Sequence, residues 1–360
     1  MDILINGGGI AGLTLAALLQ QRGKKPTVVD RIQSYGDVGY VLSLWPLGNR
    51  VLHGLGLYPA FQENSQPLTH YIIHQADGNL LKKFDVRDLT ARYGDIRTLS
   101  RADLLQLLRS ASGGIDVRMN CTVNRMKTVL DRIEVEFSDG RQDTYDLVVG
   151  ADGINSRVRE LLYGQLPYQD TGMIVVGGWI DQDIYPLDEV HEFWGAPELL
   201  GLYSSHKRTA FALVLPANPS AGKNAKESYQ SSVLRTLEKH PLPIYRLLHE
   251  QLASSPAFDL YQLEDIRIPK WNTDRVVLLG DAAAAFLPTA GIGASMAMES
   301  AAVLSDELSR VNAKHIPDAL RLYVQRRRKR IDAIQRQSRY LAKLMGIQNP
   351  LMARLRNALI

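Results

Sequence analysis

The sequence predicts an α/β fold in which one domain is built on parallel strands and helices, a second is an inserted antiparallel sheet, and a helix closes the chain. Three observations support this prediction. A strand, a glycine-rich turn, a helix and a second strand follow one another within the first thirty residues. Two later apolar strands each run into a glycine beside an aspartate. The segment between those two strands is rich in short apolar runs broken by Gly, Pro and Asp.

The first element is a strand that enters a glycine-rich turn. Residues 2–6 (DILIN) predict the strand, and Gly7, Gly9 and Gly12 make the pattern GxGxxG. An apolar helical pattern follows, ends near Gly23, and leads into a second strand at residues 26–30. This order of elements is the context that a dinucleotide-binding, Rossmann-type turn requires.

Each position of the turn has a physical reason. Gly7 permits the tight turn, Gly9 lets the backbone approach a pyrophosphate, and Gly12 lets the helix pack closely on the strand. Ile10 and Ala11 open the helix, whose unpaired N–H groups and positive dipole end suit phosphates. These five residues are predicted to bind the cofactor.

An acidic residue ends the second strand. Asp30 lies 18 residues after Gly12 and can accept hydrogen bonds from the hydroxyls of an adenosine ribose. We place Asp30 and the adjacent Arg31 in the binding site. The pattern fits FAD and NAD alike, and a strand–helix–strand unit without a ligand is the alternative.

Two further signals lie far along the chain. Residues 146–156 read DLVVGADGINS, a strand that runs into Asp152 and a glycine. Residues 275–279 (RVVLL) form a buried-strand pattern that ends at Gly280 and Asp281. Four alanines and the run PTAGIGA follow, and a helical pattern rich in small residues extends from Ala294 to Leu308.

In this order the motifs resemble those of the class A flavoprotein monooxygenases, the para-hydroxybenzoate hydroxylase-like family of FAD-dependent aromatic hydroxylases. The family's three motifs match GxGxxG at residues 7–12, Asp152-Gly153 and Gly280-Asp281. Residues 100–104 (SRADL) resemble its arginine segment. The resemblance covers nearly the whole chain and implies that FAD is the cofactor.

The resemblance also implies roles for individual residues. Asp281 would bond the ribityl chain of FAD, and Arg101 would reach the flavin near the ribityl and pyrophosphate groups. Asp152 lies in the motif linked to both FAD and NAD(P)H. A further helix would begin at the pyrimidine edge of the isoalloxazine. The residues at its start would be Pro288, Gly291, Ile292, Gly293 and Ala294. Residues 36–61 resemble the family's loop and helix beside the flavin.

Four positions depart from the family pattern. The chain has Ala284 where the family often has His, Ser295 where it often has Asn, and Glu299 where it often has Asp. The acid of the second strand is Asp30 instead of Glu. These departures put the substrate in doubt more than the fold.

The predicted fold is therefore a Rossmann-type FAD-binding domain with an inserted antiparallel-sheet substrate domain and a C-terminal helix. The FAD-binding domain is predicted to comprise residues 1–70, 96–165 and 270–330, the substrate domain residues 71–95 and 166–269, and a C-terminal basic helix residues 331–360. Residues 222–255 look helical. The predicted sheet carries four possible pocket aromatics: Trp179, Phe193, Trp194 and Tyr203.

The resemblance implies an enzyme that hydroxylates an aromatic or polycyclic small molecule. NAD(P)H would reduce FAD, O2 would form a flavin C4a-hydroperoxide, and one oxygen atom would pass to the substrate. The sequence names no catalytic base. The alternatives are a flavin-dependent reductase or dehydrogenase on the same fold, a flavin halogenase, whose WxWxIP signature the sequence lacks, and a non-catalytic FAD-binding protein.

The composition limits which cofactors, compartments and partners are expected. The single cysteine, Cys121, excludes an internal disulfide framework, and the histidines show no metal-ligand spacing. With no secretory pattern in the first residues, we expect a cytoplasmic protein. The net charge is +4, yet residues 326–360 hold ten Lys or Arg and one acid. We interpret this segment as a solvated helix face; we expect no nucleic-acid partner, and membrane docking is a minority alternative.

Overall fold

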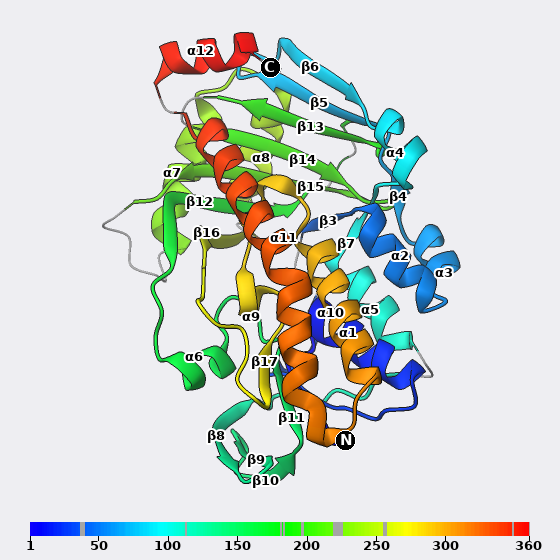
Figure 1. Cartoon of the computed structure of the whole chain (residues 1–360). Coiled ribbons are helices and arrows are strands. Elements are labelled where there is room, and N and C mark those ends of the chain that lie inside the picture. The colour runs from blue at the N-terminus through cyan, green and yellow to red at the C-terminus, as the bar shows by residue number, and fades with distance from the viewer. Residues whose placement is uncertain are drawn as a thin grey trace.

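The computed structural model describes residues 1–36, 40–111, 114–180, 182, 184–195, 198–218, 226–254, 258–347 and 349–359. Within these residues the strands form a parallel sheet, a large sheet and two small sheets, shown in Figure 1. Residues 37–39 of the predicted loop beside the flavin, and residues 222–225 and 255 of the predicted helical segment, lie outside the described residues. The α/β fold class predicted from the sequence is confirmed.

The parallel sheet contains the three strands that precede the motifs. Its order is β17-β11-β1-β2, with bounds Val276–Leu278, Leu147–Gly150, Ile3–Asn6 and Thr27–Val29. Its strands are apolar and almost entirely buried, as expected for a sheet covered on both faces. The register Asn6↔Gly150 and Gly150↔Leu278 brings the carboxyl ends of three strands to one edge. The glycine turn, the DG motif and the GD motif therefore start at the same edge of the sheet.

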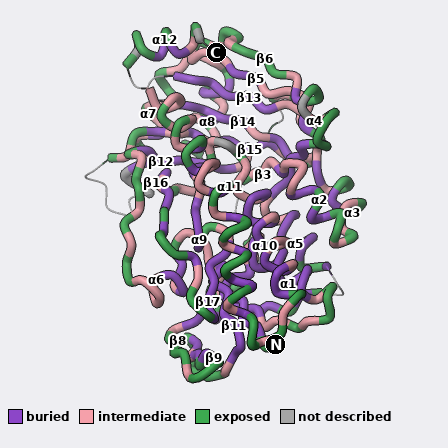
Figure 2. Tube along the Cα trace, viewed as in Figure 1, coloured by how far each residue is buried: buried purple, intermediate pink, exposed green. Residues whose placement is uncertain are grey.

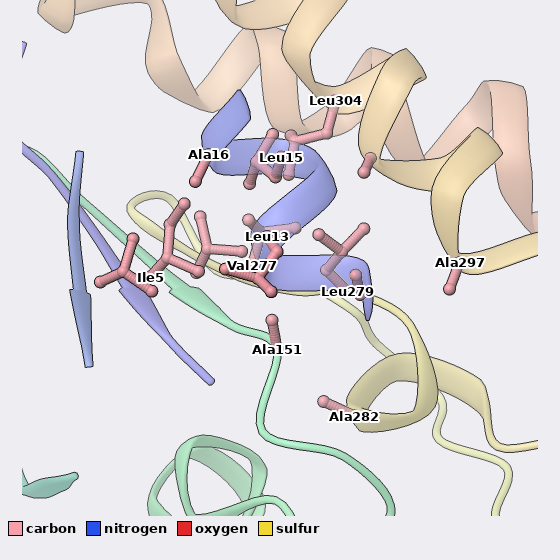
Figure 3. Packing of buried hydrophobic residues seen from close by; sticks show 14 of the residues in the cluster. Ile5, Leu13, Leu15, Ala16, Ala151, Val277, Leu279, Ala282, Ala297 and Leu304 are labelled. Carbon is pink, nitrogen blue, oxygen red and sulfur yellow. The ribbon is translucent and has the colours of Figure 1, made fainter. Parts of the chain in front are cut away.

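Helices cover this sheet and place its motifs against one another. The helices of this part of the chain are α1 (Ile10–Gln21), α5 (Arg101–Ser110), α6 (Arg157–Tyr163), α9 (Asp281–Ala284) and α10 (Gly293–Ser309). As predicted, Gly23 follows α1 with φ +75°. Leu13 and Leu15 of α1 belong to a core shared with Val277 and Leu304, drawn in Figure 3. Figure 2 shows the same buried band around α1, β11 and β17.

The large sheet confirms the inserted antiparallel sheet. Its order is β16-β12-β15-β14-β13-β5-β6, with bounds Asp259–Asp265, Gln169–Trp179, Thr209–Pro216, Leu199–Ser204, Glu189–Trp194, His70–Gln75 and Leu80–Asp85. Neighbouring strands pair antiparallel except β13 with β5, which pair parallel. Apolar residues of one face pack on α7 (Lys226–Glu238) and α8 (Pro243–Ser254). The opposite face is turned toward Leu287 and Ala342.

Smaller elements complete the two parts. One small sheet has the order β3-β7-β4, with bounds Val41–Leu44, Arg97–Ser100 and Gln66–Pro67. The other, β10-β9-β8, spans Gln142–Tyr145, Arg132–Phe137 and Val123–Val129, and the sequence analysis did not predict it. The short helices are α2 (Pro46–Gly54), α3 (Tyr58–Glu63) and α4 (Arg87–Tyr93), with the 3-10 turns η2 (Pro288–Ala290) and η3 (Ala313–His315).

The C-terminal helix differs from its predicted bounds. Helix α11 runs without a break over Ile316–Met345, so the predicted start at residue 331 falls in its middle. A second helix, α12, spans Pro350–Leu359. The sequence from residue 318 to 345 holds no Gly or Pro that would stop a helix, and Gly346 and Pro350 separate the two. In Figure 1, α11 extends from the parallel sheet up to the large sheet.

Several basic side chains of α11 pair with acids of the body. Arg327 is 2% exposed, and its guanidinium lies 2.8 Å from a carboxylate oxygen of Glu299. Arg339 binds Asp265 through two contacts of 2.5 and 2.6 Å. The positive charge seen in the sequence therefore serves partly to attach the helix. Among the described residues, no helix is long and apolar enough to cross a membrane.

Candidate active site

Two glycines of the turn are required by packing. Gly7 has φ +118°, and a Cβ built on it would lie 2.3 Å from the carbonyl oxygen of Ala151. A Cβ on Gly12 would lie 1.9 Å from the carbonyl oxygen of Gly7. The first glycine thus lets β1 pass close to β11, and the last lets α1 sit on the turn.

The middle glycine is different, because the space beside it is open. A Cβ on Gly9 would meet nothing within 4 Å, and its φ of −78° suits any residue. Gly9 is also the N-cap of α1, and no side chain caps that helix. The first-turn N–H groups at Ile10 and Ala11 are left for an external acceptor. Uncapped donors beside open space fit a pyrophosphate.

Asp30 lies against the turn at the end of β2. Its carboxylate accepts the Gly8 N–H at 2.6 Å and the Ile32 N–H at 3.1 Å. The Tyr35 hydroxyl donates to the Gly8 carbonyl at 2.7 Å. Arg31 follows and is exposed. The structure brings Asp30 and Arg31 to the glycine turn, and their contacts with a ribose stay a prediction.

The DG motif has an internal role that the sequence analysis did not predict. The Asp152 carboxylate accepts the Asn6 amide, the Ser156 hydroxyl and the backbone N–H groups of Arg157 and Val158 at 2.5 to 3.1 Å. Asp152 therefore ties β1 to the start of α6. Burial raises the pKa of this carboxyl. Its predicted contact with a cofactor stays a prediction.

Arg159 also acts inside the protein. It is 4% exposed, and its guanidinium donates to the carbonyls of Ile154 and Ala282. The residue therefore links the DG motif to the helix that follows the GD motif. This internal linkage is the role that the described contacts support.

The GD motif places an acid within electrostatic reach of a cation. Gly280 has φ +62°, and a Cβ on it would lie 2.8 Å from the Ala11 Cβ, so the motif packs directly on α1. Asp281 opens α9 and is solvent-accessible, although protein atoms surround its carboxylate. Desolvation raises the pKa of Asp281 to about 6, and the charge of Arg101 partly opposes this rise. The structure thus brings these two predicted site residues together.

Replacing Asp281 with asparagine is expected to stabilise the apo-protein and weaken FAD binding. The folded-state pKa lies above the ordinary value of 3.8, so the ionised carboxylate costs stability that grows as the pH rises from about 4 through about 6. D281N should therefore melt at a higher temperature than wild type at pH 7.5 and at the same temperature near pH 4. It should bind FAD about tenfold more weakly, because a charged acceptor is lost. Thermal unfolding of apo-protein and FAD titration measure both; no gain in melting temperature at pH 7.5 would show that the carboxylate is well solvated.

The predicted flavin-facing segment forms a tight turn before α10. Pro288 begins η2, and Gly291 follows in the left-handed region with φ +57°. Ile292 is the N-cap of α10, and no side chain caps the helix, so the N–H groups at Gly293 and Ala294 have no side-chain acceptor. This uncapped end fits a group that gains negative charge.

The same segment lies beside β3, as the resemblance implied. The nearest atoms to a Cβ on Gly291 belong to Ser43, at 3.8 Å. Ser295, which replaces the family's usual Asn, accepts the Trp45 N–H at 2.9 Å and so joins α10 to the end of β3. Glu299, which replaces Asp, pairs with Arg327. Two of the departures therefore have structural roles.

The open face of the large sheet carries a row of small residues in one register line. We call the following five residues, one from each of β16, β12, β15, β14 and β13, the central row: Asp259, Gly177, Ala212, Gly201 and Glu192. Side chains in one register line point to the same face. Nothing larger than a methyl group rises from the three middle strands, and an acid stands at each end.

Two tyrosines lean over the central row. The Tyr203 hydroxyl would lie 2.4 Å from a Cβ on Gly201, and the Tyr261 hydroxyl 3.5 Å from one on Gly177. Tyr261 is 39% exposed, and desolvation raises its pKa to about 12. Tyr40 is 36% exposed and lies within electrostatic reach of Asp281 and Tyr261. Tyr261 and Glu192 were not predicted because their placement depends on strand register, and Tyr40, just before β3, was not predicted either.

The predicted pocket aromatics divide between the two faces of the sheet. Tyr203 lies on the open face, and Trp179 lies beside Ala210 on the same face. Trp194 is also on this face but is 8% exposed. Phe193 belongs to the core under α7 and α8, because it is one residue out of phase, so its prediction as a pocket residue is wrong.

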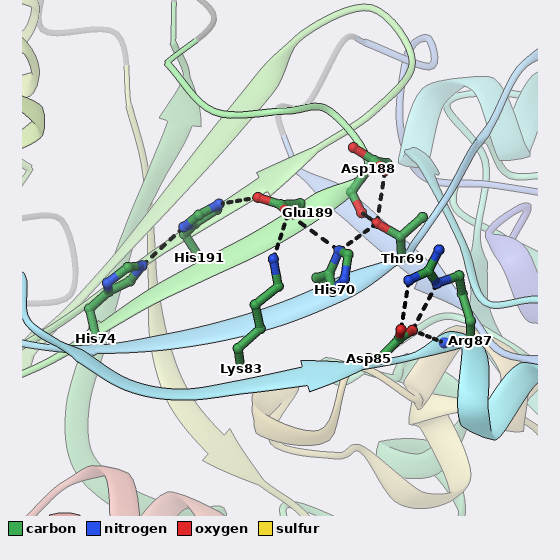
Figure 4. A network of polar contacts seen from close by, with 9 residues as sticks. All are labelled: Thr69, His70, His74, Lys83, Asp85, Arg87, Asp188, Glu189 and His191. Atoms are coloured by element: carbon green, nitrogen blue, oxygen red, sulfur yellow. Dashed lines mark hydrogen bonds and ion pairs between the residues drawn. The ribbon is translucent and has the colours of Figure 1, made fainter.

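His191 of the large sheet is held by contacts inside the protein. His191 lies 3.0 Å from the His74 ring nitrogen and 3.1 Å from Glu189, and its ring stacks on Tyr185. Figure 4 shows this network between β5 and β13, together with Lys83. Burial lowers the pKa of His191. Among the described residues no group of three His, Cys, Asp or Glu is placed to hold a metal.

A cavity of ≈ 370 Å³ lies on the open face beside the central row. Its apolar wall is formed by Met173, Leu199, Val214, Leu263, Leu287, Ala342 and Met345. Polar groups at its edge are Asp170, Thr171, Thr289, Arg339 and Lys343. It therefore joins the sheet, the segment before Pro288 and the C-terminal half of α11, and its volume suits a small organic molecule.

Comparisons with known proteins agree with this geometry. Residues 1–338 match the family model described as an FAD binding domain. The chain is 31% identical over 363 residues to the 3-amino-4-hydroxybenzoate 2-monooxygenase PtnB3 of Streptomyces platensis, covering 94% of this chain and 86% of that one. It is 26% identical over 395 residues to the FAD-dependent monooxygenase atmM of Aspergillus flavus, covering 98% and 81%. The crystal structure of Klebsiella pneumoniae HpxO complexed with FAD and uric acid shares the fold, with a TM-score of 0.88 at 24% identity over 99% of this chain and 92% of that one.

Proposed function

The chain belongs to the FAD-dependent monooxygenases of the para-hydroxybenzoate hydroxylase type, and we propose that it uses NAD(P)H and O2 to hydroxylate an aromatic or polycyclic small molecule. The observation that carries this proposal is the meeting of the glycine turn and Asp281 at one edge of the parallel sheet, with Arg101 within electrostatic reach of Asp281. The names of relatives such as the 3-amino-4-hydroxybenzoate 2-monooxygenase support an aromatic substrate.

The residues of the chain divide the work of holding FAD. When bound, FAD supplies the redox chemistry, accepting a hydride from NAD(P)H and activating O2. The open space at Gly9 and the start of α1 would hold the pyrophosphate, and Asp30 the ribose. Asp281 and Arg101 would hold the ribityl chain. The uncapped start of α10 would stabilise negative charge at the pyrimidine edge of the ring.

The substrate is proposed to enter between the large sheet and the flavin-facing segment. The ≈ 370 Å³ cavity lies there, with Leu287 and Thr289 next to the predicted flavin contact at Pro288. Its apolar lining suits a ring system and would exclude water around the reacting atoms.

Filling this cavity is expected to damage substrate binding more than folding. Ala342 is half-buried on α11 and lines the cavity, so A342W should raise KM about tenfold or more while FAD content stays normal. Arg336 is exposed on the same helix and does not line the cavity, so R336W is the matched control. An unchanged KM in A342W would place the substrate elsewhere.

The proposal is tested by following NAD(P)H oxidation and O2 uptake with a panel of aromatic and polycyclic compounds. A monooxygenase consumes both faster with one class of compound, and the product gains one oxygen atom. A reductase would transfer electrons to the substrate without O2 uptake. A protein that binds FAD but never oxidises NAD(P)H, with any compound, would be a non-catalytic flavoprotein and would overturn the proposal.

A further inference from the structure

A buried acid stands on the open face of the large sheet, outside the groups assigned so far. Glu192 is 2% exposed, and it has no ion-pair partner among the described residues. One carboxylate oxygen accepts the Tyr203 hydroxyl at 2.7 Å, and the other accepts the Trp194 indole N–H at 2.8 Å. The Tyr71 hydroxyl lies within electrostatic reach of the same carboxylate. A carboxylate removed from water without a cation is costly, so its neutral donors must all be in place.

The acid fixes the direction of the Tyr203 hydroxyl. A phenol has one proton to donate, and here that proton is directed at Glu192. Burial next to Glu192 raises the pKa of Tyr203 and of Tyr71 well above the ordinary value, so both phenols stay protonated. The Tyr203 oxygen, which lies above Gly201, therefore has only lone pairs left for a further partner.

Among the described residues no charged group forms an ion pair with Glu192, although Arg339 and Lys343 stand at the edge of the adjoining cavity. Asp259 stands at the far end of the central row, and Tyr261 lies between the two acids. Arg208 stacks on the ring of Trp179 with 3.7 Å to the centroid, toward the end of β15 away from the cavity. Arg101, in the parallel-sheet part of the chain, acts on Asp281.

We propose that Glu192, acting through Tyr203, is a positioning residue that selects neutral or cationic aromatic substrates carrying an O–H or N–H donor and disfavours a carboxylate at this place. The inference rests on the proposed function and names its substrate class. The accepting Tyr203 oxygen would attract an O–H or N–H donor of the substrate. The negative charge of Glu192, which has no ion-pair partner among the described residues, would repel a carboxylate.

The experiment compares two probes of nearly the same shape, of which one is neutral with N–H donors and the other carries a carboxylate. FAD-loaded protein is titrated with 4-hydroxybenzamide and with 4-hydroxybenzoate, and both dissociation constants are measured by flavin fluorescence or calorimetry. Wild type is expected to bind the amide about tenfold or more tightly than the carboxylate. E192Q removes the charge and should bring the two constants within about threefold, chiefly by tightening the carboxylate. Y203F should weaken the amide about fivefold or more, because the accepting oxygen is lost.

The same titrations include a control variant and can overturn the inference. Glu134 is exposed on β9, so E134Q should leave the ratio of the two constants unchanged. The inference is overturned if wild type binds neither probe or binds the carboxylate at least as tightly, or if folded E192Q keeps the wild-type ratio. If E192Q does not fold, the wild-type ratio and Y203F decide alone. The binding titrations need no turnover, so the two proposals can fail separately. If the protein prefers the amide over the carboxylate as expected but consumes no O2, the proposed function is wrong and the role proposed for Glu192 still stands.

Discussion

Replacing Gly12 with alanine is expected to prevent stable folding of the parallel-sheet part of the chain. The added Cβ would lie 1.9 Å from the Gly7 carbonyl oxygen and 3.2 Å from Ile5. The first contact is with backbone, which cannot rotate away, and Gly7 is itself fixed between β1 and β11. We expect a loss of about 3 kcal/mol or more in the free energy of unfolding. Chemical denaturation measures this loss.

The control for this variant is a glycine where a methyl group has room. Gly54 has open space within 4 Å and no positive φ, so G54A should keep the wild-type stability within about 0.5 kcal/mol. If G12A unfolded at the same denaturant concentration as wild type, α1 would not pack on the turn as described.

Replacing Gly9 with alanine is expected to leave the fold intact and abolish tight FAD binding. The φ of −78° suits alanine, and the added methyl group meets nothing within 4 Å. That methyl group would occupy the space proposed for the pyrophosphate, next to the uncapped start of α1. We expect an affinity loss of roughly 100-fold, about 2.7 kcal/mol. FAD titration of apo-protein measures the affinity, and thermal unfolding of the same sample measures the fold.

The two glycine variants separate packing from binding. They lie three residues apart in one turn, yet the structure gives only one of them free space. If G9A kept wild-type FAD affinity, the pyrophosphate would not lie at this turn. If G9A instead unfolded like G12A, the space beside Gly9 would be filled by the protein itself.

The motifs predicted the parallel sheet well because each one combines a local pattern with a physical requirement. Residues 2–6 and 26–30 became β1 and β2, and Gly23 ended α1 where a left-handed residue was expected. The short apolar runs between the DG and GD motifs include the strands β12, β13, β14 and β15 of the large sheet. In these segments local propensity and tertiary packing agree.

The sequence was less informative wherever register or distant contacts decide. Neighbouring residues of a strand point to opposite faces of the sheet, so either Phe193 or Glu192 lies on the open face. The apolar run in the sequence does not show which of the two it is. The internal roles of Asp152 and Arg159 depend on partners in other elements of the chain. The length of α11 was underestimated because its first half was assigned to the FAD-binding domain. The central row appears only once five strands are aligned.

One measurement tests most directly whether this chain is an oxygen-inserting flavoenzyme. Purified protein loaded with FAD is incubated with NAD(P)H, a stimulating aromatic compound and ¹⁸O2, and the product is analysed by mass spectrometry. The structure and the family predict a product heavier by one ¹⁸O atom, with one NAD(P)H oxidised for each product formed. A product without ¹⁸O, or NAD(P)H oxidation that no compound accelerates, would contradict the proposed function.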